Sequence, residues 1–256
     1  MSIFNKMLAS VGIGASKVDT RLEQDTLTPG ETVKGVVVIT GGSTEQNIDS
    51  IYLSLNTTYL KESDDKKYSV KACIDRFKVA DPFTVKSGEK KEFPFSFRLP
   101  FDTPVTIGRT KIWLSTGLDI KNAIDPTDTD YIRVAPNPTM SAILSAIEEL
   151  GFRLREADCE QAPYKMRVRL PFVQEFEFVP VGGQFKGRLD ELEVVLLPNS
   201  QGDIEVLMQV DRRVRGLGSF LSEALSMDES NVRFVVSPSE VPYVRQKIKS
   251  IIERYS

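Results

Sequence analysis

The chain has 256 residues, of which 33 are basic and 36 acidic, so its formal net charge is −3. This length allows one large or two ordinary domains, each with its own core. The slight acidic excess argues against nucleic acid as a main ligand, because phosphate binding needs a surplus of Lys and Arg. Histidine occurs nowhere, which excludes Ser-His-Asp and Cys-His nucleophile systems and zinc sites that contain histidine.

The first predicted element is a short amphipathic helix within residues 1–15. Its apolar residues fall at helical spacing: Ile3, Phe4, Met7, Leu8 and Val11. Gly12 and Gly14 then end it. The stretch is too short for a secretory signal, and no run of roughly eighteen apolar residues predicts a membrane-spanning helix. The helix could rest on a membrane surface, but its single lysine would give marginal affinity, and we favour packing on the protein or on a partner.

Residues 16–136 are predicted to form a β-sandwich, because short segments with apolar-polar alternation are separated by Pro, Gly, Asn and Asp. The stretch "TPGETVKGVVVITGG" is typical: Pro29-Gly30 predicts a tight turn, and a β-branched strand follows. A similar sequence pattern, "VGGQFKGRLDELEVVLL", occurs later in the chain. We interpret both as a turn that leads into an edge or near-edge strand.

A helix is predicted over residues 137–151, with two prolines, Pro136 and Pro138, around its start and Gly151 at its end. Strands resume over residues 152–238, with a small helical insertion in "SFLSEALS", and a C-terminal amphipathic helix closes the chain over 239–256. The sequence therefore predicts an all-β protein of two tandem, immunoglobulin-like β-sandwich domains with short terminal and inter-domain helices.

Acidic residues offer two candidate sites. Asp125, Asp128 and Asp130 lie close enough together to suggest calcium or a metal-assisted hydrolase, but the segment lacks the glycine and terminal glutamate of an EF-type loop. We therefore favour a turn with local capping, no metal and no cofactor. Glu175 and Glu177 could be a glycosidase pair, but they share one face of a strand, and we expect that face to be solvated.

The run Arg212, Arg213 and Arg215 could bind an anion or a phosphopeptide. The alternative that we favour is an inter-domain polar network, with Asp190, Glu191 or the aspartate cluster as partners. Arg109 raises the same two possibilities. Trp113 is interpreted as a core residue. The cysteines Cys73 and Cys159 are too few and too scattered for a metal cluster, and we expect reduced thiols in a cytoplasmic protein.

Five stretches also resemble the bacterial sporulation-control protein family, the stage-zero "M" regulators. They are "VDTRLEQDTLTPGETVKGVVVITGG", "PVTIGRTKIWLSTGLDIKNAIDPTDTDYI", "LGFRLREADCE", "RLPFVQEFEFVP" and "LMQVDRRVRGLG". That family is similar to arrestins in fold, so the resemblance implies two arrestin-like sandwiches, a regulatory role in the decision to sporulate, and no catalytic residues. It also implies a buried polar network near the domain junction, for which the aspartate cluster and the arginine run could supply charges.

These observations lead to a non-catalytic regulator that binds other proteins, and we expect those partners to belong to the sporulation and signalling machinery. We expect an extended peptide to add to an exposed strand edge, and we place that edge at Val33, Val36 and Val38, with Phe185 in the later copy. The alternatives are the metal-assisted hydrolase and a peripheral membrane scaffold that uses the N-terminal helix. A homo-oligomer is left open.

Overall fold

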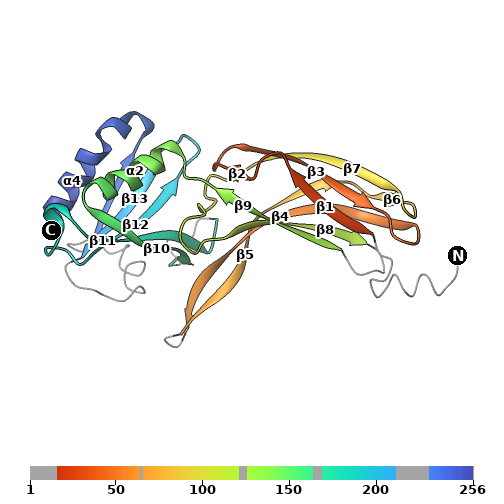
Figure 1. Ribbon diagram of the computed structural model, residues 1–256, viewed down its shortest axis with the longest axis horizontal. Helices are drawn as coiled ribbons and strands as arrows, with labels where there is room; N and C mark the ends of the chain where they lie inside the picture. Colours follow the sequence, from red (N-terminus) through yellow and green to blue (C-terminus); the bar gives the residue numbers. More distant parts are fainter. Residues whose placement is uncertain (1–15, 64–65, 121–125, 164–168, 212–230, 256) are drawn as a thin grey trace. The chain divides into compact units, whose positions relative to one another are not determined.

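The computed structural model describes residues 16–63, 66–120, 126–163, 169–211 and 231–255. Within these ranges the protein is mostly β-strand, with multiple sheets and two α-helices, as the sequence predicts (Figure 1). The predicted N-terminal helix and the helical insertion "SFLSEALS" lie outside the described residues.

The chain divides into two compact units, and both are discontinuous in sequence. The first takes its described residues from Met1–Thr57, Ala72–Pro100 and Lys111–Arg133, and the second from Thr58–Lys71, Phe101–Thr110 and Val134–Ser256. The predicted boundaries, at 16–136 and 152–238, are contiguous instead. The difference arises because the long strands β4 (Gln46–Ser63) and β5 (Lys66–Ala80) each contribute residues to both units.

The first unit contains a three-stranded antiparallel sheet in the order β1-β3-β7. These strands are β1 (Lys17–Leu22), β3 (Thr32–Thr40) and β7 (Lys90–Arg98). Its remaining strands pair around β4 and β8, and they are β2 (Thr26–Leu27), β6 (Phe83–Val85), β8 (Ile112–Ile120) and β9 (Thr127–Val134). Apolar side chains from both groups of strands share one core, because alternate residues of each strand point inward: Val37, Ile39, Ile51, Leu53 and Leu118.

The turn before β3 has the predicted geometry. The amide of Glu31 donates to the Thr28 carbonyl oxygen at 3.0 Å, and Gly30 has a φ of 90°. This closes a turn in which Pro29 fixes one φ and glycine accepts the left-handed conformation. The later copy differs, since it contains a 3-10 turn over Gly183–Phe185.

The second unit is built on an antiparallel sheet in the order β14-β13-β12-β11-β10. The strands are β10 (Phe152–Gln161), β11 (Phe172–Pro180), β12 (Glu191–Pro198), β13 (Ile204–Asp211) and β14 (Asn231–Val236). At β10 a single parallel pair, Glu160 with Leu60, connects this sheet to the far end of β4.

Two helices, α2 (Pro138–Glu149) and α4 (Val244–Tyr255), lie on the same side of this sheet (Figure 1). Asn137 caps α2 by accepting from the amide of Met140 at 2.8 Å. A 3-10 turn over Pro238–Tyr243 precedes α4, which therefore begins later than the predicted start at residue 239. The buried residues of the helices meet the apolar face of the sheet, where Phe176 and Phe178 are fully buried.

The opposite face of this sheet carries carboxylates, because alternate residues of each strand share a side. The register pairs Asp158 with Glu175 and Glu177 with Glu193, and it places Gln209 beside Glu193. We call this side the acidic face.

Candidate functional site

The predicted partner-binding edge is wrong in its placement. β3 pairs with β1 on one side and with β7 on the other, so Val33, Val36 and Val38 lie in a central strand. Val33 and Val38 are also buried in the core. Phe185 is fully buried and contacts Phe152, with the ring centroids 5.5 Å apart. None of these residues presents a free backbone edge to a partner.

The aspartate cluster is described only in part, because Asp125 lies outside the described residues. Asp128 accepts from the amide of Thr129 at 2.9 Å, which is the local capping that the sequence predicts. It also accepts from the amide of Thr20 on the distant strand β1 at 2.7 Å, a contact that the sequence did not predict. Burial, assisted by the nearby charges of Asp128 and Asp19, raises the pKa of Asp130 to about 6. Within the described ranges, no group of three or more Cys, Asp or Glu side chains is arranged to hold a metal ion.

Arg212, Arg213 and Arg215 lie outside the described residues, so the inter-domain polar network stays a prediction. Arg109 is resolved: its guanidinium donates to Asp158 and Glu156, with Nε to Asp158 Oδ1 at 3.1 Å. The hydrogen bond to Asp158 raises the pKa of Arg109. This arginine therefore takes part in an intramolecular pair.

Two sequence interpretations of single residues have simple outcomes. Trp113 was predicted to be a core residue, but it is only partly buried in β8, where its neighbours Ile112 and Leu114 enter the core. Its ring contacts Tyr131 of β9, with the ring centroids 6.0 Å apart. Neither Cys73 nor Cys159 forms a disulfide among the described residues; the first is exposed and the second is buried.

The acidic face is buried rather than solvated, which overturns the sequence expectation for Glu175 and Glu177. Their exposed fractions are 4% and 2%, and those of Glu191 and Glu193 are 2% and 3%. Arg155, which lies at a bulge in β10, reaches into this cluster and pairs with Glu177 and Glu191. The bulge matters because it directs the Arg155 guanidinium toward the acidic face, where it pairs with buried carboxylates.

Glu175 stands out within this cluster, because neither of its carboxylate oxygens has a hydrogen-bond partner. Burial, with the charges of Glu193 and Glu160 as further causes, raises its pKa to about 9. Glu160 is held by Lys67 at 3.1 Å, yet burial still raises its pKa. Glu175 is therefore a neutral carboxylic acid at neutral pH, and its carboxyl group keeps a proton that it would lose in water.

A groove of about 480 Å³ opens where β11 begins, β12 ends and β13 begins. We call it the sheet-end groove. Its apolar lining comes from several elements of the second unit: Pro104, Met140, Leu170, Phe172, Val173, Leu196, Leu197, Pro198 and Val235. The sequence did not predict this site, because its lining comes from segments far apart in the chain and forms no short motif.

Seven of the sixteen described residues that line the sheet-end groove are polar or charged. Arg169 donates from Nε to Asp102 Oδ2 at 2.8 Å and also binds Asp102 through Nη2. Glu205 is held by Arg233, and Asp203 accepts from the side-chain amide of Asn199 at 3.3 Å. Thr103 also lines the groove; it is 2% exposed, and its hydroxyl has no hydrogen-bond partner.

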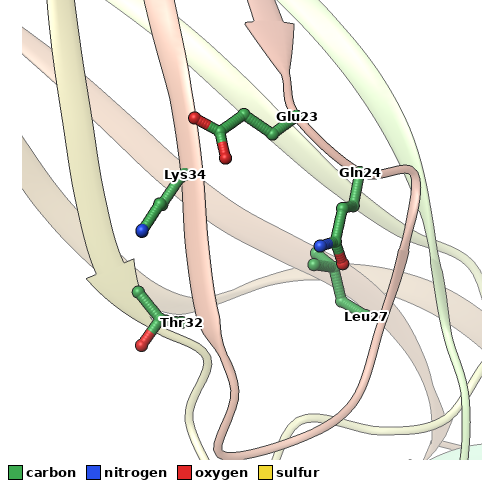
Figure 2. A pocket seen from close by; sticks show the side chains of 5 residues that line it. All are labelled: Glu23, Gln24, Leu27, Thr32 and Lys34. Carbon is green, nitrogen blue, oxygen red and sulfur yellow. The ribbon is translucent and has the colours of Figure 1, made fainter.

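A smaller hollow of about 230 Å³ lies in the first unit beside the turn before β3 (Figure 2). Glu23, Gln24, Thr32 and Lys34 surround it, and Leu27 is its one buried lining residue. Because its polar side chains are exposed and only one apolar group lines it, this hollow offers a ligand little burial.

No helix among the described residues is long and apolar enough to span a membrane.

Comparisons with known proteins agree on one family. The model of a family described as "SpoOM protein" matches residues 4–214. The chain is 47% identical over 259 residues to "Sporulation-control protein spo0M" of Bacillus subtilis (strain 168), and the match covers 100% of both chains. The crystal structure of Spo0M, sporulation control protein, from Bacillus subtilis is similar with a TM-score of 0.89 and 46% identity, covering 95% of this chain and 100% of that one.

Proposed function

The chain belongs to the SpoOM protein family, and we propose that it is a non-catalytic regulator that acts in the control of sporulation by binding other proteins. The observation that carries the proposal is the full-length match to a relative named for sporulation control. A match that covers both chains from end to end transfers a role more safely than a match to one shared domain.

A non-catalytic role is supported by the chemistry of the chain. The sequence holds no histidine, which is the usual general base near neutral pH. Arg109 and Arg155 are engaged by carboxylates, and Glu175 lies buried with no open approach for a substrate. We further propose that the units are arrestin-like β-sandwiches, which would suit a regulator that offers surfaces rather than a reactive centre.

The strand edges support protein binding and indicate which edge is available. β7 is an outer strand of its sheet, but Pro94 lies in its middle and Lys90, Lys91 and Arg98 lie near its ends. Proline and charge are the usual protection of an edge against added strands. β14 is the outer strand of the other sheet among the described residues and has no proline. We therefore propose β14 as the binding edge, in place of β3.

The proposal is tested in a spore-forming bacterium whose own family member has been deleted. Expression of this chain should restore the frequency of heat-resistant spores, and crosslinking followed by mass spectrometry should recover cytoplasmic proteins bound to it. A purified chain that turns over a small substrate, or a deletion strain whose spore frequency the chain leaves unchanged, would contradict the proposal.

A further inference from the structure

We propose that the sheet-end groove of the second unit is the binding site for an extended peptide segment of a partner protein, in which a large apolar side chain lies next to a basic one. The inference rests on the proposed function, because it assigns a site and a partner chemistry to the protein binding proposed above.

The size and lining of the groove fit an apolar side chain. Its volume of about 480 Å³ falls in the range of sites that hold small ligands, roughly 300 to 1,000 Å³. Phe172 and Val173 of β11, Leu196 and Leu197 of β12 and Met140 of α2 are five of its nine described apolar lining residues. Because these residues lie on strands and a helix, the groove is formed before a partner arrives.

Thr103 indicates that the groove also receives a polar group. Its hydroxyl is buried and lacks a hydrogen-bond partner, although it lines the groove. An unpaired buried hydroxyl destabilises the folded protein, and a ligand that bonds to it removes that cost. A peptide brings backbone amide and carbonyl groups beside each apolar side chain, so it satisfies this hydroxyl while filling the groove.

The charge at the groove favours a basic partner. Among the described residues, Asp102, Asp203 and Glu205 line it, against the single cation Arg169. Arg169 pairs with Asp102, and Arg233 pairs with Glu205, so the acidic excess at the rim comes from Asp203. A lysine or arginine next to the inserted apolar residue would therefore be attracted, whereas an acidic neighbour would be repelled.

The position of β14 favours an extended chain over a small molecule. Val235 of β14 lines the groove and is 47% exposed. Among the described strands β14 pairs only with β13, so an added strand could bond to its other side while one side chain enters the groove. The Val235 carbonyl oxygen accepts from Lys247 Nζ at 2.6 Å, and an added strand that used this carbonyl would replace that bond.

The experiment measures binding of fluorescein-labelled nonapeptides to the full-length chain by fluorescence anisotropy. The probe alternates lysine and leucine, and two controls replace lysine by glutamate or leucine by serine. We expect the lysine–leucine peptide to bind at least tenfold more tightly than either control, with an affinity that falls as salt is raised.

Two substitutions locate the site. Val235→Arg, which places a cation at the rim, should weaken binding about tenfold, and Asp203→Asn should weaken it about threefold. Their matched controls are Val181→Arg, at a valine that is 42% exposed outside the groove, and Glu148→Gln on α2; both should bind as the unmodified chain does. If Val235→Arg does not fold, as judged by circular dichroism, Asp203→Asn and the salt dependence decide.

Equal binding of the three peptides, or equal effects of Val235→Arg and Val181→Arg, would overturn the assignment. So would binding of phenethylamine, an apolar amine without a peptide backbone, in the absence of peptide binding. The spore assay distinguishes failure of the groove assignment from failure of the proposed function. If the chain and its Val235→Arg variant restore spores equally, the groove assignment fails while the proposed function stands. If the unmodified chain restores none, the proposed function fails.

Discussion

Replacing Glu175 by glutamine should make the protein more stable at neutral pH and should remove part of its pH dependence. Glu175 is 4% exposed, its two oxygens have no partner, and burial raises its pKa from 4.5 to about 9. In the unfolded chain the same carboxyl ionises near its ordinary pKa of 4.5. Folding at neutral pH therefore takes up a proton, which glutamine does not need.

The magnitude follows from linkage. A carboxyl whose folded pKa is raised contributes its full stability below the unfolded pKa and loses it as the pH rises toward the folded pKa. Between pH 4.5 and about 9, each pH unit lowers the free energy of unfolding by about 1.4 kcal/mol. At pH 7 the loss is therefore about 3 kcal/mol, and Glu175→Gln should recover up to that amount, since an amide occupies nearly the same volume.

The assay is urea unfolding followed by far-ultraviolet circular dichroism at pH 5, 7 and 9. The difference in stability between Glu175→Gln and the unmodified chain should be small at pH 5 and should grow at each step. Fluorescence of Trp113 reports on the first unit, and recording it separately shows whether the units unfold together. Glu148→Gln, on the exposed side of α2, is the control and should give a constant difference. A stability difference for Glu175→Gln that does not change with pH would refute the inference that Glu175 is protonated in the folded protein.

Three further substitutions test the packing of the second unit. Gly151→Ala should cost more than about 1 kcal/mol in urea unfolding, because φ is 96° and the added Cβ would lie 2.4 Å from the Gly182 carbonyl oxygen; Gly182→Ala, which meets no atom within 4 Å, should cost much less. Ile248→Ala should cost about 2–5 kcal/mol, since this α4 side chain is fully buried, and a loss below about 1 kcal/mol would show that α4 does not pack as described. Hydrogen bonds from Lys247 and then from Ser237 lower the pKa of Glu240 to about 2, so its contribution is present above pH 4.5 and is lost as the pH falls toward 2. Glu240→Gln should therefore lower the melting temperature at pH 7 and match the unmodified chain near pH 2; an equal deficit at both pH values would contradict the pairing.

Much of the local structure could be predicted, because it depends on neighbouring residues. The turn at Pro29-Gly30 and the end of α2 at Gly151 both follow from φ preferences and hydrogen bonds over a few residues. Alternation also correctly placed Glu175 and Glu177 on one face of β11. What lies against that face depends on the rest of the chain, and the expectation of a solvated face failed for that reason.

Which strands pair with one another could not be predicted from the sequence. A β-branched run such as Val33 to Ile39 has the same composition in an edge strand as in a central one, and only the positions of β1 and β7 make it central. The sheet-end groove was missed on similar grounds. Thr103, Arg169, Asp203 and Val235 meet only after several distant segments have folded, and none of them belongs to a recognisable motif.

The interleaving of the two units limits how the protein can be cut or exchanged. A fragment that begins at residue 137 would lack Val105 and Thr110, which satisfy the buried amide of Gln174, and would also lack Asp102 and Thr103. Neither half can therefore be expressed as an intact module by a single truncation. Gene shuffling that swaps one half between relatives would have to carry three separate stretches together, so the two units are expected to be inherited as a single piece.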